Sequence, residues 1–310
     1  MRFASSTLLL IFSYFVVARR VMGVNEKMKI LLLGHKGMLG TDLMRRLGVA
    51  HAVTGKDVED FDITSPESCR QVISEINPEV VINAAAYTNV DGAETNGDAC
   101  FAVNAEGVRN VALACGKGDI RIVHFSTDYV FDGTKGTPYL EEDTPSPRGV
   151  YAQSKAVGEK YLQECSKNYL LIRTAWLYGR SGKNFVKTIL GKARQTDTLR
   201  VVDDQTGSPT YSRDLAGAVQ ILLEQRCQGI FHVTNRGSCT WHAFTKKILE
   251  YSGLAHVDVE PIQTADLNLP APRPAYSVLN TRKFSDATGN ILRFWQLALR
   301  DYLEHTEIHK

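Results

Sequence analysis

The chain has 310 residues, of which 44% are hydrophobic and 23% are charged, and its formal net charge is +2. This length suffices for one large domain or two smaller ones with a sizeable core, and the composition is that of an ordinary globular protein. The small net charge gives no reason to expect a nucleic-acid partner. Six cysteines lie scattered without a Cys-x-x-Cys pair and the eight histidines lack ligand spacing, which predicts reduced thiols and no metal site.

Residues 1–27 are interpreted as an N-terminal leader or extension that is separate from the fold. Residues 7–18 are almost wholly apolar and are flanked by arginines, a pattern that resembles a signal peptide. The run is shorter than the ~20 residues of a typical transmembrane helix. Because Met28 stands directly before the first predicted strand, we expect a cytoplasmic protein whose fold begins there. The alternative is a form tethered to a membrane through the apolar N-terminus.

Apolar runs alternate with helical spacing from residue 28 to residue 175. The first run, 29–33, is bounded by glycine and predicts a buried parallel strand. Further predicted strands are 80–83, 120–125 and 170–172, and predicted helices are 38–47, 98–115 and 151–161. Such alternation predicts an α/β fold, a Rossmann-like doubly wound parallel sheet with helices on both faces.

The pattern loosens over residues 176–310. Helical spacing covers 184–194, 214–223 and 241–251, a short strand is expected at 230–233, and the proline-rich stretch 261–275 predicts a loop. This part is too short and irregular for a second Rossmann half. We therefore predict a smaller C-terminal lobe for substrate, closing over the carboxyl edge of the sheet, with some segments returning to the first domain.

A glycine turn follows the first predicted strand and opens the first helix. Its spacing is Gly-x-x-Gly-x-x-Gly, which lets backbone N–H groups approach a pyrophosphate at a helix N-terminus. The alternative is an ordinary strand–helix turn. A dinucleotide-binding domain over 28–175 is therefore predicted. Its candidate cofactor contacts in the turn are Gly34, Lys36, Gly37, Met38, Leu39 and Gly40.

The choice between NAD and NADP depends on the end of the second strand, where an acid usually holds the ribose 2′-hydroxyl of NAD. We expect this strand to end near residues 52–54, and no acid stands clearly at its tip. Lys56, with His35 or Lys36, could meet a 2′-phosphate. The sequence thus favours NADPH, and NADH remains the alternative if Asp57 turns inward.

Several other residues could line the cofactor. Asp62 and Ile63 suit an adenine edge and face, although Asp62 could equally cap the next helix. Small residues at the end of strand 80–83 permit close approach of a flat ligand. An amide inside helix 98–115 either is satisfied by backbone or orders a water behind Lys155. These further candidates are Asp62, Ile63, Ala84, Ala85, Ala86, Tyr87 and Asn104.

A hydroxyl, a phenol and an ammonium complete the candidate catalytic group. Thr127 ends strand 120–125, where its hydroxyl could bind a substrate carbonyl oxygen. Lys155 lies one helical turn after Tyr151, and its charge should lower the pKa of the phenol. Tyr151 could then protonate an oxygen as a hydride reaches the adjacent carbon. Trp176, at the end of the next strand, could be core or could flank a sugar.

From about Met28 to Leu303 the chain resembles the dTDP-4-dehydrorhamnose reductase family of extended short-chain dehydrogenases/reductases. The glycine turn and the Tyr151/Lys155 pair mark only the larger family. The other supporting stretches are Asn83–Thr88, Val90-Asp91, Ser126–Phe131, Arg173–Tyr178, Asp204–Thr210 and Arg273–Asn280. The most specific motifs within them are Thr127–Phe131, Gln205–Thr210 and Arg273–Leu279.

The resemblance implies that NADPH or NADH delivers hydride to C4 of a 4-keto sugar on dTDP. Tyr151 would protonate the resulting alkoxide, Thr127 would bind that oxygen, and Lys155 would hold the nicotinamide ribose and tune Tyr151. The implied substrate contacts are Thr88, Thr127, Asp128, Trp176 and Arg273.

Bacterial members of this family can bind Mg²⁺ at a homodimer interface through acidic residues. Asp42 stands where a longer Glu is common, and this shortening argues against the metal and that mode of dimerisation.

Three rival functions remain at this point. A nucleotide-sugar 4,6-dehydratase would need an acid pair directly after Thr127, whereas Asp128 is followed by Tyr129. A 4-epimerase usually carries a Ser-rich stretch at 126–128. A non-catalytic relative, of the type of the regulatory subunit of methionine adenosyltransferase, would keep the fold as a binding module. Intact Thr127, Tyr151 and Lys155 favour an enzyme.

Overall fold

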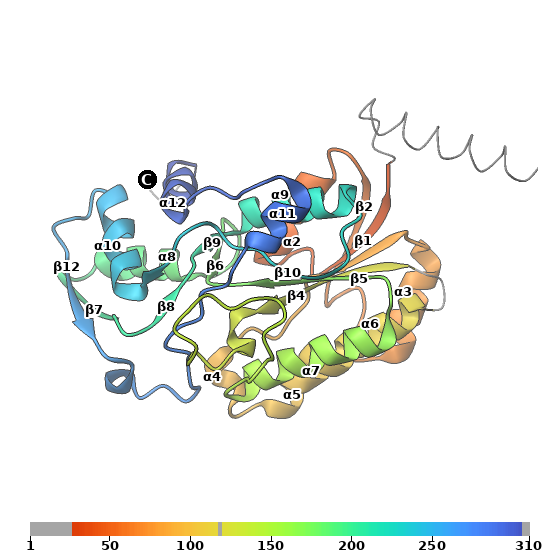
Figure 1. Cartoon of the computed structure of the whole chain (residues 1–310), viewed down its shortest axis with the longest axis horizontal. Helices are drawn as coiled ribbons and strands as arrows, with labels where there is room; N and C mark the ends of the chain where they lie inside the picture. The colour runs from red at the N-terminus through yellow and green to blue at the C-terminus, as the bar shows by residue number, and fades with distance from the viewer. Residues whose placement is uncertain (1–26, 117–119, 306–310) are drawn as a thin grey trace, which may run out of the picture.

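A computed structural model describes residues 27–116 and 120–305 (Figure 1). The leader expected at 1–27 lies almost entirely outside these residues. Within them, no helix combines the length and the apolar character needed to cross a bilayer.

The centre of the molecule is a six-stranded sheet in the order β10-β5-β4-β3-β1-β2, in which every neighbouring pair is parallel. The order reverses direction beside β1, as in a doubly wound sheet, so the predicted fold class is confirmed. The strands are β1 (Lys29–Leu33), β2 (Ala52–Lys56), β3 (Val80–Asn83), β4 (Arg121–Thr127), β5 (Tyr169–Thr174) and β10 (Gly229–His232).

Helices cover both faces of this sheet, which explains why its inner strands β1 and β3 are largely apolar and buried. Ile30 and Leu32 of β1 face one core, whereas Leu31 and Leu33 face the other. The first face carries α2 (Met38–Leu47), α9 (Ser212–Glu224) and α11 (Arg282–Thr288) (Figure 1). The second carries α3 (Pro66–Ile76), α6 (Gly107–Gly116) and α7 (Val150–Cys165).

The predicted helix 98–115 is confirmed, but it is not uniform. It runs from α5 (Gly97–Phe101) through a π-helical segment, Ala102–Glu106, into α6. Single π-helical turns within α-helices often mark functional sites. Asn104 lies in this segment.

A second core lies to one side of the sheet and belongs to the C-terminal part of the chain (Figure 1). Its helices are α8 (Phe185–Ala193), α10 (Trp241–Tyr251) and α12 (Trp295–Glu304). They pack beside β7 (Thr198–Val202), which pairs in parallel with β12 (Asp258–Ile262). Short ladders join β6 (Leu177–Tyr178) to β9 (Thr210–Tyr211) and β8 (Thr206–Gly207) to β11 (Cys239–Thr240).

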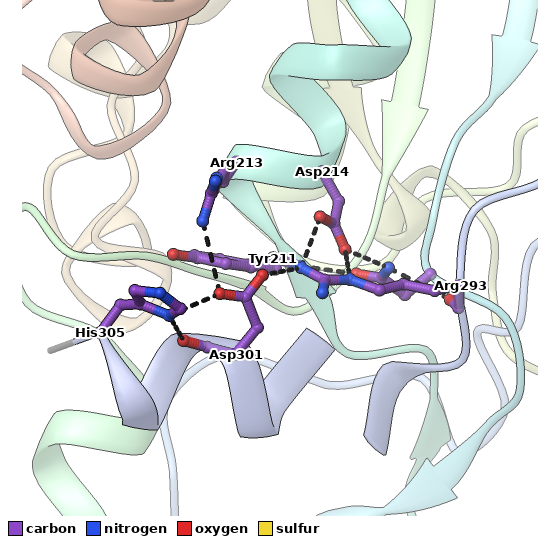
Figure 2. A network of polar contacts seen from close by, with 7 residues as sticks. Tyr211, Arg213, Asp214, Arg293, Asp301 and His305 are labelled. Carbon is purple, nitrogen blue, oxygen red and sulfur yellow. Dashed lines mark hydrogen bonds and ion pairs between the residues drawn. The ribbon is translucent and has the colours of Figure 1, made fainter. Parts of the chain in front are cut away.

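An arginine–carboxylate network ties this lobe to the sheet domain (Figure 2). Arg293 binds both carboxylate oxygens of Asp214 on α9 at 2.8 Å. The same guanidinium lies 2.5 Å from Asp301 on α12, which Arg213 approaches to 3.3 Å. The network therefore joins a helix that covers the sheet to a helix of the lobe.

Candidate active site

The glycine turn between β1 and α2 allows very close backbone packing. Gly34 has φ +78°, and a Cβ there would lie 2.7 Å from the backbone nitrogen of Ala85. At Gly40 a Cβ would lie 2.1 Å from the carbonyl oxygen of Gly34. Gly37, the N-cap of α2, contributes no side-chain cap. The helix start thus presents backbone N–H groups and a positive dipole end, which fit a pyrophosphate.

The side chains of Met38 and Leu39, two of the predicted cofactor contacts, do not line the glycine turn in the same way. Leu39 is buried in the core of the first face, so only its backbone is at the turn. Met38 is half-buried, and its side chain lies against Gly179, at the start of the lobe.

The end of β2 differs from the sequence-based expectation. The strand continues to Lys56, and Asp57 follows at its tip. An Asp57 carboxylate oxygen accepts a hydrogen bond from the Lys36 backbone nitrogen at 2.8 Å. Asp57 has therefore turned inward against the glycine turn, which was the alternative that leaves room for NADH.

Two lysines surround this tip, and both lie near acids. Lys36 Nζ is 3.0 Å from Glu59, and Lys56 Nζ is 3.9 Å from Asp60. The hydrogen bond to Glu59 raises the pKa of Lys36. Lys36 and Lys56 thus lie beside the place where a ribose 2′-substituent would be held.

The residues predicted to meet the adenine are placed in a turn and in the core. Asp62 accepts hydrogen bonds from the Thr64 nitrogen at 2.8 Å and from its hydroxyl at 2.7 Å. Ser65, rather than Asp62, caps α3. Ile63 is 7% exposed and packs beside Gly107. Its side chain consequently belongs to the core on the second face of the sheet, with Leu31 and Leu33.

The loop after β3 is held by Asn104. The Asn104 side chain accepts from the Tyr87 nitrogen at 2.9 Å and donates to the Tyr87 carbonyl at 3.0 Å. It also donates to Ser154 Oγ on α7 at 3.1 Å. Of the two alternatives left open by the sequence, the structure shows the first: the Asn104 amide is hydrogen-bonded to backbone groups. Asn104 therefore fixes the loop of Ala84, Ala85, Ala86 and Tyr87 that passes beside the glycine turn.

Thr127 and Tyr151 are brought together at the carboxyl end of β4. The Thr127 hydroxyl donates to Asp128 Oδ1 at 3.0 Å and accepts from the Tyr129 nitrogen at 3.2 Å. Tyr151 lies in the first turn of α7, and its phenol interacts with Thr127. The predicted hydroxyl–phenol pair is therefore present in the structure.

The pKa of Tyr151 moves opposite to the sequence-based expectation. Desolvation by neighbouring groups raises this pKa, the charge of Asp128 raises it further, and the Thr127 hydrogen bond lowers it. The phenol is consequently protonated at neutral pH, which is the form that a general acid requires.

The Lys155 ammonium is bound by groups of β4. Its ammonium donates to the Phe125 carbonyl at 2.6 Å and lies 3.4 Å from His124 Nε2. Burial lowers the pKa of Lys155 to about 8, while the charge of Glu159 opposes that shift. The expected tuning of Tyr151 by Lys155 is therefore not seen in this conformation.

Asp128 is the most perturbed carboxyl group beside the pair. It is 2% exposed, and burial raises its pKa to about 7 against the hydrogen bonds of Ser277 and Thr127. Its Oδ2 is buried and makes no hydrogen bond within the described residues. Perturbed carboxyl groups of this kind cluster at functional sites.

A buried ion pair lies beneath the catalytic group and was not identified from the sequence. Arg173 binds both oxygens of Glu159, at 2.9 and 2.7 Å, and each residue is 2% exposed. Arg173 Nη1 also donates to the Glu141 carbonyl at 3.3 Å and lies 3.4 Å from His232 Nε2. The sequence analysis singled out the stretch that begins at Arg173. It could not identify the partners of this arginine, because they are distant in the sequence.

The candidate substrate residues are arranged in three different ways. Thr88 is exposed in the loop after β3. Arg273 forms a two-pronged ion pair with Asp91 of α4 (Val90–Ala93), at 3.0 and 2.8 Å. This pair joins two of the stretches that carry the family resemblance. Trp176 stacks on Trp241 of the lobe, a residue that the sequence analysis did not single out.

Asp42 does not fit the role of a metal ligand. It is 5% exposed, accepts from Ser212 Oγ at 2.5 Å and lies 3.5 Å from Arg45. Across residues 27–116 and 120–305, no group of three or more His, Cys, Asp or Glu side chains is arranged to hold a metal ion.

Comparison with known proteins identifies the family. The family model for the RmlD substrate binding domain matches residues 28–308. The chain belongs to this family. One relative is the spore coat polysaccharide biosynthesis protein SpsK of Bacillus subtilis, 40% identical over 89% of this chain and 97% of the relative.

Two further RmlD-family relatives carry reductase names. The dTDP-4-dehydrorhamnose reductase of Burkholderia thailandensis is 36% identical over 88% of this chain and 97% of that protein. The crystal structure of dTDP-4-dehydrorhamnose reductase from Bacillus anthracis, in complex with NADP, is 36% identical with a TM-score of 0.88. That match covers 90% of this chain and 100% of the solved chain.

Proposed function

We propose that the protein is an oxidoreductase that reduces the 4-keto group of dTDP-4-dehydro-β-L-rhamnose to give dTDP-L-rhamnose, with NADPH as cofactor and NADH as a second choice. The contact between Thr127 and the protonated phenol of Tyr151 carries this proposal, because it supplies both groups that a keto oxygen needs. The names of the relatives supply the substrate and the place in dTDP-rhamnose biosynthesis.

The residues divide the chemistry between them. When bound, the nicotinamide supplies the hydride. The Thr127 hydroxyl binds the keto oxygen. Tyr151 gives that oxygen its proton as the C=O double bond becomes a C–O single bond and new C–H and O–H bonds form. Lys155, fixed to the Phe125 carbonyl, keeps a positive charge near the ribose side of the site. Phenolate formed on Tyr151 regains its proton from solvent.

The remaining candidates hold the two ligands. Gly34, Gly37 and Gly40 cradle the pyrophosphate, and Lys36 and Lys56 attract a 2′-phosphate. Thr88, Asp128, Trp176 and Arg273 contact the dTDP-sugar, with Asp91 holding the Arg273 guanidinium in place.

The rival functions predict other results in a single assay. We expect NADPH oxidation when the protein is incubated with NADPH and dTDP-4-keto-L-rhamnose. A pure binding module would leave NADPH unchanged, and an epimerase or dehydratase would convert sugar without net oxidation of NADPH.

The decisive variant is Tyr151→Phe. Removal of the proton donor should lower kcat by roughly 10²- to 10⁴-fold. Tyr161→Phe, on the same helix α7, is the matched control and should keep parental activity. If parent and Tyr151→Phe oxidise NADPH at the same rate, or neither does, the reductase proposal is rejected.

We further propose that the native protein starts near Met28, acts in the cytoplasm as a homodimer, and uses 28–175 for cofactor and most of 176–310 for substrate. Intact mass of the native protein tests the start, and light scattering at catalytic concentrations tests the dimer. A native mass that includes residues 1–27 would reject the cytoplasmic form.

A further inference from the structure

Trp176 lies between two cores and is held in an unusual backbone conformation. It packs against the cluster at the end of the sheet and against the lobe core. Its φ is +46°, in the left-handed region that bulky residues rarely adopt. Such a conformation costs roughly 1–3 kcal/mol and persists only where the surroundings enforce it.

Trp241 covers one face of the Trp176 indole. The two ring centroids are 3.4 Å apart and the planes differ by 4°. Aromatic pairs ordinarily favour offset or edge-to-face contacts at longer range. Full overlap of the two rings therefore indicates that other contacts press them together.

Gly207 covers the other face. A Cβ at Gly207 would lie 2.3 Å from Cε2 and 2.5 Å from Nε1 of Trp176. The space between two fully stacked rings cannot hold this glycine, so Gly207 lies on the side opposite Trp241. With both faces covered, the indole edge, including its Nε1–H donor, is what remains for a sugar.

Trp241 is itself fixed from several directions. Its Nε1 donates to Gln205 Oε1 at 3.1 Å, and Gln205 donates to Thr264 Oγ1 at 2.9 Å. Phe185 of α8 packs against it at a centroid distance of 4.3 Å. The preceding residue, Thr240, caps α10. Trp241 thus belongs to the rigid frame of the lobe.

Strand β8, which contains Gly207, also connects the two stacked tryptophans to the segment beside Asp128. Thr206, between Gln205 and Gly207, donates its N–H to the Ala275 carbonyl at 2.8 Å. Its carbonyl accepts from the Ser277 nitrogen at 2.8 Å, and the Ser277 side chain lowers the pKa of Asp128. One strand therefore contacts both Trp176 and the segment of Ser277 beside Asp128.

We propose that Trp241 is a positioning residue that determines sugar specificity: stacked on Trp176 opposite Gly207, it forces the Trp176 indole to present its N–H edge to the substrate. An edge donor selects a sugar by a hydrogen bond, whereas a free face would accept any apolar sugar surface. This inference rests on the reductase function proposed above. It specifies how Trp176, which the sequence left as either a core residue or one that flanks a sugar, would meet the substrate.

The kinetic test compares Trp241→Leu and Trp241→Phe with the parent. Loss of an aromatic pair should raise the KM for the dTDP-sugar roughly 3- to 10-fold in Trp241→Leu. The KM for NADPH should be unchanged, because the stacked pair of Trp176 and Trp241 includes no residue of the glycine turn. Trp241→Phe keeps an aromatic face and should recover most of the sugar KM.

A spectroscopic readout separates positioning from general damage. The chain has three tryptophans, and the stacked pair should give an exciton couplet in circular dichroism. Trp241→Leu and Trp241→Phe should lose the couplet. Trp295→Phe, in the lobe core, should keep both the couplet and the sugar KM. If the leucine variant fails to fold, Gly207→Ala, whose added methyl group displaces the Trp176 indole and so disturbs the same stack, should likewise change the couplet and raise the sugar KM.

Two results would overturn the inference while leaving the reductase function intact. One is a folded Trp241→Leu variant that has lost the couplet and keeps the sugar KM of an active parent. The other is a rise in NADPH KM equal to the rise in sugar KM. A parent that never oxidises NADPH with the sugar would instead reject the proposed function.

Discussion

The two ends of the candidate site differ in how far water reaches them. At the reaction end, Thr127, Asp128 and Lys155 are 8%, 2% and 3% exposed. At the far end of the cofactor cradle, the side chains of Lys36 and Glu59 are 56% and 62% exposed.

This difference decides what charge can do at each end. At the dry end burial moves the pKa values of Asp128 and Lys155 to about 7 and about 8, so protonation states become sensitive to single contacts. At the wet end solvent and salt screen each ion pair. The dry end suits proton transfer, and the wet end suits reversible recognition of a phosphate.

The largest expected effect comes from breaking the buried pair beneath the reaction end. Arg173→Met would leave the Glu159 carboxylate buried without its partner, so we expect a loss of about 3–5 kcal/mol in the free energy of unfolding. Urea denaturation measures this loss. Replacing both residues with methionine should recover most of it, since no uncompensated charge remains.

A matched surface arginine sharpens the contrast. Arg282 pairs with Asp286 on α11, and their side chains are 83% and 66% exposed. Arg282→Met should change the free energy of unfolding by no more than about 0.5 kcal/mol. Equal losses for the two arginine variants would contradict the distinction between a buried and an exposed pair.

The next effect is the pH dependence contributed by Asp128. Its folded-state pKa, about 7, lies above the value of an unfolded aspartate. The stabilising contribution is therefore complete below pH ~4 and is lost as pH rises through about 7. Asp128→Asn should flatten the dependence of stability on pH between 4 and 8, measured by urea midpoints at each pH. A curve parallel to that of the parent would show that Asp128 is ionised throughout.

At the wet end the prediction concerns cofactor choice. Lys56→Glu should weaken NADPH binding by about 1 kcal/mol, roughly five-fold, and should weaken NADH binding less, because only NADPH carries a 2′-phosphate. Titration of both cofactors at low and high salt measures the difference, which salt should reduce. An equal loss for both cofactors would remove Lys56 from the phosphate site.

The smallest effect is expected for the exposed pair of Lys36 and Glu59. Glu59→Gln removes the hydrogen bond that raises the pKa of Lys36, yet exposed pairs of this kind often contribute nothing measurable to stability. We expect an unchanged urea midpoint. A shift of the urea midpoint as large as that of Arg173→Met would show that solvent does not screen the pair of Lys36 and Glu59.

The sequence was sufficient for the sheet and for the position of the site because both follow from local patterns. Continuous apolar runs predicted β1, β3, β4 and β5, and strand ends predicted where Thr127 and the glycine turn would lie. The strands β7 and β12 were missed, since β7 is exposed along one side and β12 along most of its length. Local sequence carries little signal for such a pair.

The direction of individual side chains could not be predicted, because their partners are distant in sequence. Lys155 turns to the Phe125 carbonyl, Asn104 to the Tyr87 backbone, and Arg173 to His232. Spacing placed Lys155 on the same helical face as Tyr151 but could not reveal this competing acceptor. For the same reason Trp241 gave no signal before its stacking partner was known.

The chain crosses between sheet domain and lobe several times. After β5 it enters the lobe, returns as α9 and β10, leaves again for α10, returns as α11 and ends in α12 (Figure 1). A chain that crosses in this way has no single linker between the two parts, so any closure over a ligand must move several connecting segments together. It also means that the two parts cannot be inherited or exchanged as separate modules, since a cut after residue 175 would strip the sheet of β10 and leave α2 without α9.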